Sequence, residues 1–271
     1  MLEQLVDLER YPLQAQGSAR FKAVLEAARA EVARAGAAEL PGFLTPRGLA
    51  LALADARTLA KLAYRSGGMG TAYLELPDAS FPADHPRKHF ERYDVGVVAY
   101  DQFPGESPIR RLYEAQALMD FVGAVLERGK LHRYADPFGG LNLAVMRDGD
   151  QLQWHFDQTD FVISLALEDS EEGGDFEVAP RIRSRDDERY TEVGRVLRGE
   201  SQAVVRLPMQ PGTLLIFEGR NSVHRVSALC GPTERLVALL AYDTKPGTVS
   251  SPVLRMVSDR WWSKARWAAA T

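Results

Sequence analysis

Apolar residues recur at helical spacing through the first 130 residues of the chain. One such segment begins after Ser18, a good helix N-cap, and ends at Gly36, a residue that favours the left-handed backbone of a helix stop. Two later segments begin with a capping residue followed by proline, which is favoured in the first helical turn. We therefore expect three helices that pack their apolar faces on the rest of the protein, over residues 18–36, 45–65 and 107–129.

After residue 140 the pattern changes to short apolar runs bounded by Gly, Pro, Asp or Asn, which is typical of antiparallel strands. The length and spacing of these runs favour a sandwich or barrel, so the expected fold class is an all-β core with flanking helices. A helix over about 187–198 interrupts the strands. The expected strands are 70–76, 95–100, 141–146, 152–157, 161–168, 175–180, 203–209, 213–218, 221–227 and 235–243.

A proline-rich, charged stretch separates the first two expected strands. Long loops inside compact domains are often lids or binding loops. We expect residues 77–93 to cover a substrate site. His85 and His89 fall in this loop, and we expect them to be solvated.

The chain has the composition of an ordinary globular protein, with 271 residues, 45% hydrophobic and 26% charged. No linker or repeat divides it, so we expect a single domain over 1–271, with helical support and lid in 1–130 and the β core in 140–245. The 33 basic against 37 acidic residues argue against a nucleic-acid partner, whose phosphates require clustered Lys and Arg. The single cysteine excludes an internal disulfide, and no signal peptide or membrane span is evident. We expect a cytoplasmic protein with no membrane partner, and leave open whether it is a monomer or a homodimer.

Five histidines occur, and two of them suggest a metal site. His155 and Asp157 alternate along an expected strand, so both side chains point to the same face. His224, on another expected strand, can supply a third ligand. Two histidines and one carboxylate leave three open positions on an octahedral metal, as in non-haem Fe(II) oxygenases. The alternative for such a tripeptide is a histidine hydrogen-bonded to its neighbouring aspartate.

Arg235 lies on the next expected strand after His224, in an otherwise apolar run. An arginine in such a strand requires a partner, and its planar fork suits a carboxylate held beside the metal.

The segments around these residues are recognisable. WHFDQTDF (154–161), EEGGDFEVAP (171–180), TLLIFEGRNSVHRVS (213–227) and CGPTERLVALLAYDTKPGT (230–248) resemble the Fe(II)- and 2-oxoglutarate-dependent oxygenases. More narrowly they resemble the BesD-like group of free amino-acid halogenases and hydroxylases, over residues 95–250 and in the opening 13 residues. The resemblance implies a double-stranded β-helix (jelly roll), Fe(II) bound by His155, Asp157 and His224, O2 as co-substrate, and the distal carboxylate of 2-oxoglutarate held by Arg235.

The resemblance also bears on the reaction, because related halogenases have a small residue where this chain has Asp157. Fe(II) takes about six ligands. The three side chains use three, 2-oxoglutarate two and O2 the last, which leaves no position for a halide. We therefore expect a hydroxylase that inserts oxygen into an unactivated C–H bond and releases succinate and CO2. The alternatives are a halogenase-like or nucleotide-directed oxygenase of the same group, and a non-catalytic 2-oxoglutarate-binding module.

The expected substrate is a small polar metabolite, either a free amino acid or a derivative. Lysine itself is disfavoured, because the positions that carry polar residues in the lysine enzymes are apolar here; they are Leu152, Val237, Leu239 and Ala241. Candidate substrate contacts are Asn142, Asp160 and Glu177, each of which could equally serve the structure. Trp261 and Trp262 would either close the pocket or pack on the core.

Overall fold

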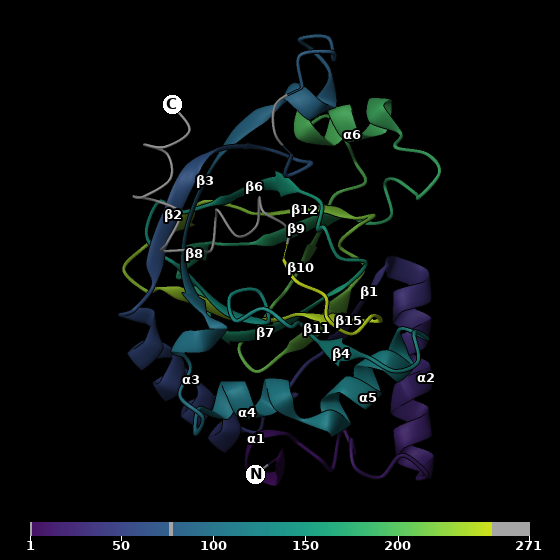
Figure 1. Cartoon of the computed structure of the whole chain (residues 1–271), viewed down its shortest axis with the longest axis vertical. Coiled ribbons are helices and arrows are strands. Elements are labelled where there is room, and N and C mark those ends of the chain that lie inside the picture. The colour runs from purple at the N-terminus through teal and green to yellow at the C-terminus, as the bar shows by residue number, and fades with distance from the viewer. Residues whose placement is uncertain (1, 76–77, 251–271) are drawn as a thin grey trace.

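The strands form two antiparallel sheets that face each other across an apolar interior (Figure 1). The computed structural model describes residues 2–75 and 78–250. The larger sheet has the order β1-β11-β7-β14-β5-β3-β2 and the smaller one β10-β9-β12-β6; β13 pairs with β8, and β15 with β4. The strands are β1 (Ala37–Leu40), β2 (Tyr64–Thr71), β3 (Phe90–Ala99), β4 (His132–Arg133), β5 (Leu141–Met146), β6 (Leu152–His155), β7 (Val162–Glu168), β8 (Glu172–Gly173), β9 (Phe176–Ala179), β10 (Val205–Leu207), β11 (Leu214–Phe217), β12 (Val223–Val226), β13 (Leu229–Cys230), β14 (Arg235–Leu240) and β15 (Tyr242–Asp243).

Side chains of the larger sheet alternate between two buried environments. On β5, Leu143 and Val145 belong to the core shared with the helices, whereas Ala144 and Met146 belong to the interior between the sheets. Because alternate residues of a strand point to opposite faces, both faces of this sheet are apolar. The expected class, an all-β core with flanking helices, is confirmed.

Helices cover the outer face of the larger sheet, as Figure 1 shows for α3, α4 and α5. The predicted caps are present: the Ser18 side chain accepts from the Phe21 amide at 3.1 Å, and Gly36 adopts φ 69°. On the far side of the smaller sheet, α6 packs on Trp154 and Phe156. The helices are α1 (Leu2–Leu5), α2 (Ala19–Ala35), α3 (Pro46–Ala60), α4 (Pro108–Glu114), α5 (Gln116–Val125) and α6 (Tyr190–Leu197), with 3-10 turns η1 (Pro86–Lys88) and η2 (Tyr100–Gln102). No helix in the described ranges is long and apolar enough to span a membrane.

Two local predictions were wrong, and one strand was not predicted. The third helix is divided into α4 and α5, because Ala115 between them has extended backbone with ψ 117°. The strand expected at 70–76 lies earlier, as β2, and pairs along its length with β3, which itself starts inside the expected loop. The strand β1 was not expected, since its sequence AAEL lacks β-branched residues and is ordered by pairing with β11.

Candidate metal centre

The structure brings together the three residues that the sequence suggested as metal ligands. His155 on β6 lies directly opposite His224 on β12, and Asp157 follows two residues after His155. One ligand atom from each of the three lies within 4.8 Å of the others. The arrangement follows from strand alternation, which turns Trp154 and Phe156 outward toward α6.

Backbone carbonyls orient both imidazole rings. His155 Nδ1 lies 2.8 Å from the carbonyl oxygen of Gln153, and His224 Nδ1 lies 2.9 Å from that of Ser222. A ring that donates from Nδ1 presents an unprotonated Nε2, the tautomer that binds a metal. His224 Nε2 lies 3.6 Å from Asp157 Oδ2, so the donor atoms face a common point.

Oδ2 of Asp157 is buried, and among the described residues it has no hydrogen-bond partner. Gly219 makes room for it, because a Cβ at this position would lie 1.7 Å from Oδ2. Burial raises the pKa of Asp157 to about 6, against the lowering effect of His155 and Arg220. Burial also lowers the pKa of His155 and of His224 to about 4. An orphaned carboxylate beside two neutral imidazoles is a donor set that fits a divalent transition metal.

Arg235 is buried at the start of β14, on the same face as Val237 and Leu239. Its nearest acidic partner is distant, with Nε 3.9 Å from Asp169 Oδ1. Burial lowers the pKa of the guanidinium, which Asp169 and Asp175 only partly offset. A buried arginine with so little compensation is costly unless a ligand supplies a carboxylate. Leu239, which lines the metal cavity, lies four residues further along β14, so its Cα is about 13 Å from the Cα of Arg235.

A cavity of about 370 Å³ opens beside His155 and Asp157, between the two sheets. Its wall is largely apolar. Polar side chains from β2, β5, β6 and the segment after Asp157 interrupt it. The lining includes Val95, Val97, Ala144, Leu152, Leu239, Thr71, Glu75, Tyr93, Tyr134, Asn142, Gln153, Gln158 and Thr159.

Of the three predicted substrate contacts, only Asn142 lines this cavity. Asp160 instead pairs with Arg220, with 2.6 Å between Oδ1 and Nε. Glu177 pairs with Arg225 at 2.7 Å, on the outward side of the small sheet where the Arg225 guanidinium lies 4.7 Å from the Trp154 ring centre. Both acidic residues therefore serve ion pairs outside the cavity.

The sequence did not indicate Gln153 as a cavity residue. The pairing of β6 with β12 shifts register between His224 and Val226, so that two residues of β6, Gln153 and Trp154, lie opposite Arg225 alone. Such a bulge redirects side chains and is common beside active sites. It depends on the partner strand, and only the proximity to His155 could have drawn attention to Gln153.

The loop expected to act as a lid packs on α6. Arg87 in η1 donates from Nε to the Tyr190 hydroxyl at 3.1 Å, and the His85 ring stacks on Phe81 with 4.3 Å between centres. Residues 78–90 are not among those that line the cavity, whereas Glu75 lines it and pairs with Arg87. Residues 76 and 77, like Trp261 and Trp262, lie outside the described residues.

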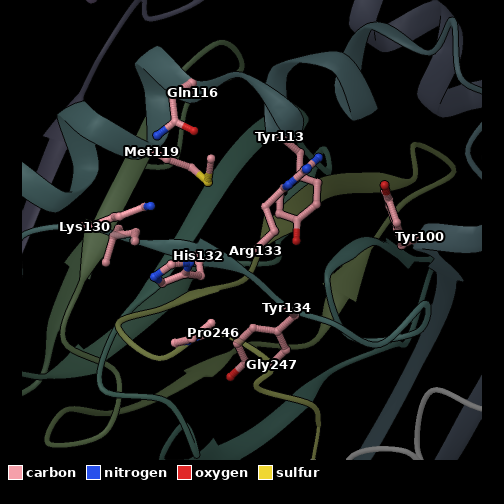
Figure 2. Close-up of a pocket in the computed structure, with 11 residues that line it drawn as sticks. Tyr100, Tyr113, Gln116, Met119, Lys130, His132, Arg133, Tyr134, Pro246 and Gly247 are labelled. Carbon is pink, nitrogen blue, oxygen red and sulfur yellow. The ribbon is translucent and has the colours of Figure 1, made fainter.

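Tyr134 lines a second cavity as well, of about 520 Å³, which Figure 2 shows. Lys130, His132 and Arg133 contribute basic groups to it, and Tyr113 belongs to its wall. Burial raises the pKa of Tyr134 to about 12, with further contributions from Asp243, Asp136 and Asp157. The Tyr134 side chain thus separates a polar surface cavity from the metal cavity.

The comparisons with known proteins agree with this geometry. The family model described as Halogenase D matches residues 93–263, more than half of the chain. Among curated proteins none matches.

Solved structures share the fold at low sequence identity. The epimerase SnoN from nogalamycin biosynthesis aligns with a TM-score of 0.58 and 20% identity, over 85% of this chain and 93% of its own. A 2OG-Fe(II) oxygenase family protein from Burkholderia pseudomallei gives 0.53 and 15%, over 82% and 91%. EctD from S. alaskensis, solved with 2-oxoglutarate and 5-hydroxyectoine, gives 0.53 and 18%, over 86% and 82%. The chain belongs to the halogenase D family and has the jelly-roll fold of the 2-oxoglutarate- and Fe(II)-dependent oxygenases.

Proposed function

We propose that the protein is an Fe(II)- and 2-oxoglutarate-dependent hydroxylase of a small polar metabolite, a free amino acid or a derivative of one. The observation that carries this is the convergence of His155, Asp157 and His224 on one point at the edge of a cavity. His155 and Asp157 line that cavity, so a substrate held there would lie next to the metal.

Each residue has a definite task in this proposal. The two imidazoles bind through Nε2 while backbone carbonyls fix their rings, and the carboxylate of Asp157 supplies the anionic ligand. Arg235 binds the distal carboxylate of 2-oxoglutarate with its bidentate fork. Fe(II) with 2-oxoglutarate and O2 supplies the oxidation of an unactivated C–H bond, with succinate and CO2 as by-products. The apolar wall around Leu152 and Leu239 keeps water away from the reacting carbon.

Asp157 supports hydroxylation over halogenation, although the matching family is described as a halogenase. Its carboxylate stands where the halogenases that the sequence resembles have a small residue and hold a halide. Gly219 is matched to that carboxylate, because any larger residue there would collide with it. The family match makes halogenation the second candidate.

The mass of the product distinguishes hydroxylation from halogenation. The Fe(II)-loaded protein is incubated with 2-oxoglutarate, O2, excess chloride and a panel of amino acids and their amides and esters, and the products are analysed by mass spectrometry. We expect a gain of one oxygen and no chlorine. A chlorinated product from the unaltered protein would refute hydroxylation, and the Asp157→Gly variant tests whether opening the position admits chloride. If none of the candidate substrates leads to the release of succinate, the non-catalytic binding module is favoured.

A further inference from the structure

Two carboxamides face the metal cavity, and within residues 2–75 and 78–250 each has hydrogen-bonding capacity that no other group satisfies. Gln153 is only 6% exposed, and among the described residues its side chain makes no hydrogen bond. It points toward Gly70 on β2, where a Cβ would lie 2.5 Å from its Nε2. The bulge and this glycine together give Gln153 its place in the cavity wall.

Asn142 is the second carboxamide. It lies on the interior face of β5, between Ala99 of β3 and Leu239 of β14. Neither neighbour has a side-chain donor, and Asn142 Oδ1 is fully buried without a hydrogen bond to any described residue. Exchanging the oxygen and nitrogen of the amide would leave a donor unpaired instead, so one hydrogen bond is missing in either orientation.

The other polar groups of the wall are either neutral or already bonded. Thr159 Oγ1 donates to the carbonyl oxygen of Phe161 at 3.0 Å, Gln158 Nε2 to that of Leu74 at 3.4 Å, and Glu75 accepts from Arg87. Thr71, Tyr93 and Tyr134 contribute hydroxyl groups to the wall. Among the described residues that line the cavity, the charged ones are Asp157 and Glu75, both acidic, and none is Lys or Arg.

This pattern of charge disfavours a substrate with a free carboxylate. Such a group would be buried against a wall with no Lys or Arg among its described residues to offset its desolvation, and the charge of the metal is already balanced by Asp157 and 2-oxoglutarate. A primary carboxamide, in contrast, offers a donor and an acceptor in one plane. The best partner for such a carboxamide is a neutral group that also offers a hydrogen-bond donor and an acceptor.

We propose that the substrate of this site carries a neutral amide, as a primary or secondary amide or a lactam, on an apolar body, and that Asn142 and Gln153 bind that amide. The proposal rests on the proposed function, since it names the substrate class of the same cavity. Among amino-acid derivatives it selects those whose carboxylate is masked as an amide.

The test uses three probes with one carbon skeleton: 4-methylpentanamide, 4-methylpentanoate and 4-methylpentylamine. Binding to the full-length protein loaded with Zn(II) and 2-oxoglutarate is measured by ligand-observed NMR, because Zn(II) is diamagnetic and permits no turnover. We expect the amide to bind roughly tenfold or more tightly than the acid and the amine, about the worth of one well-made hydrogen bond.

The variants Gln153→Met and Asn142→Leu keep the side-chain size and should bring the amide-to-acid ratio close to one. Gln151→Leu is the matched control, because Gln151 lies just before the same strand but bonds to the Arg92 carbonyl and does not line the cavity. Its ratio should equal that of the unaltered protein.

Tighter binding of the acid or the amine, equal binding of all three probes, binding by none of them, or an unchanged ratio in both cavity variants would overturn the proposal. Binding of 2-oxoglutarate is recorded in the same spectra and requires the metal. Its loss would refute the proposed function instead, so the two failures are distinguishable.

Discussion

At the scale of single residues, all three proposed metal ligands are deprotonated at neutral pH, but they take up protons in different pH ranges. Both imidazoles are neutral because burial lowers their pKa to about 4, whereas the pKa of Asp157 is about 6. A metal binds the carboxylate and the neutral ring, and so competes with protons on each. Asp157 is therefore the group that controls metal affinity between pH 5 and pH 7.

Metal affinity should accordingly be constant above pH 7 and fall about tenfold per unit below pH 6, because one proton must leave Asp157. Competition titrations with a metal indicator between pH 5 and pH 8 measure this slope. The Asp157→Asn variant should bind the metal more weakly, and its metal affinity should no longer depend on pH in this range. A fall that involves two protons and begins near pH 6.5 would mean that the histidines titrate, contrary to their burial.

Arg235→Lys should weaken 2-oxoglutarate binding by roughly 10- to 100-fold and leave metal affinity unchanged, because lysine keeps the charge but loses the planar pair of donors. Calorimetry on the metal-loaded protein measures the affinity. Arg57→Lys is the control, since Arg57 lies at the surface and pairs with Glu168. Equal affinity in Arg235→Lys would assign the distal carboxylate to another residue.

At the scale of elements, Arg87 connects the loop before β3 to α6 and to two segments beside it, and His85 adds a ring contact with Tyr190. The Arg87 guanidinium contacts the Tyr190 hydroxyl, lies 3.5 Å from Glu188 and sits 4.2 Å from the centre of the Tyr73 ring. Arg87→Ala removes all three contacts. We expect faster amide exchange in residues 78–89 and in the first turn of α6, with metal affinity unchanged.

Hydrogen exchange followed by mass spectrometry measures this effect. Arg195→Ala serves as the control, because Arg195 lies on the same helix and pairs at the surface with Glu192 of that helix, 3.6 Å away. Identical protection of the loop in the Arg87 variant and the unaltered protein would show that Phe81 and His85 hold the loop without it.

The elements also show what the sequence could reveal about the fold and the site. Strand alternation placed His155 and Asp157 on one face, and an arginine in an apolar strand pointed to Arg235. Features that depend on a distant partner could not be read in this way. The strand β2 has a glycine-rich sequence with low strand propensity and is ordered by pairing with β3. Asp160 and Glu177 have the chemistry of substrate contacts, but arginines from β12 and the turn before it bind them.

At the scale of the whole molecule, the proposed ligands connect the two sheets. His155 and His224 belong to the smaller sheet, whereas Arg235 belongs to the larger one. A metal alone therefore stabilises one sheet. The 2-oxoglutarate molecule, bound at one end by the metal and at the other by Arg235, would tie the sheets together.

The melting temperature should rise in two steps as the two ligands are added. A divalent metal should raise the melting temperature, and 2-oxoglutarate should raise it again only when the metal is present. Each ligand at a hundredfold excess over its dissociation constant adds about 2.7 kcal/mol to the free energy of unfolding. At this chain length that corresponds to roughly 5 to 10 °C. The second increment should disappear in Arg235→Ala, and its persistence there would contradict a ligand that spans the sheets.

The bulge in β6 has a consequence for how such a site can change over generations. Removal of Gln153 would leave Leu152 and His155 two positions apart, so regular pairing with β12 would resume and His155 would still lie opposite His224. In the proposed site, metal binding depends on that alignment, whereas recognition of the substrate depends on the additional residue. A one-residue insertion or deletion in this strand can therefore alter which molecule is oxidised while the chemistry is inherited intact.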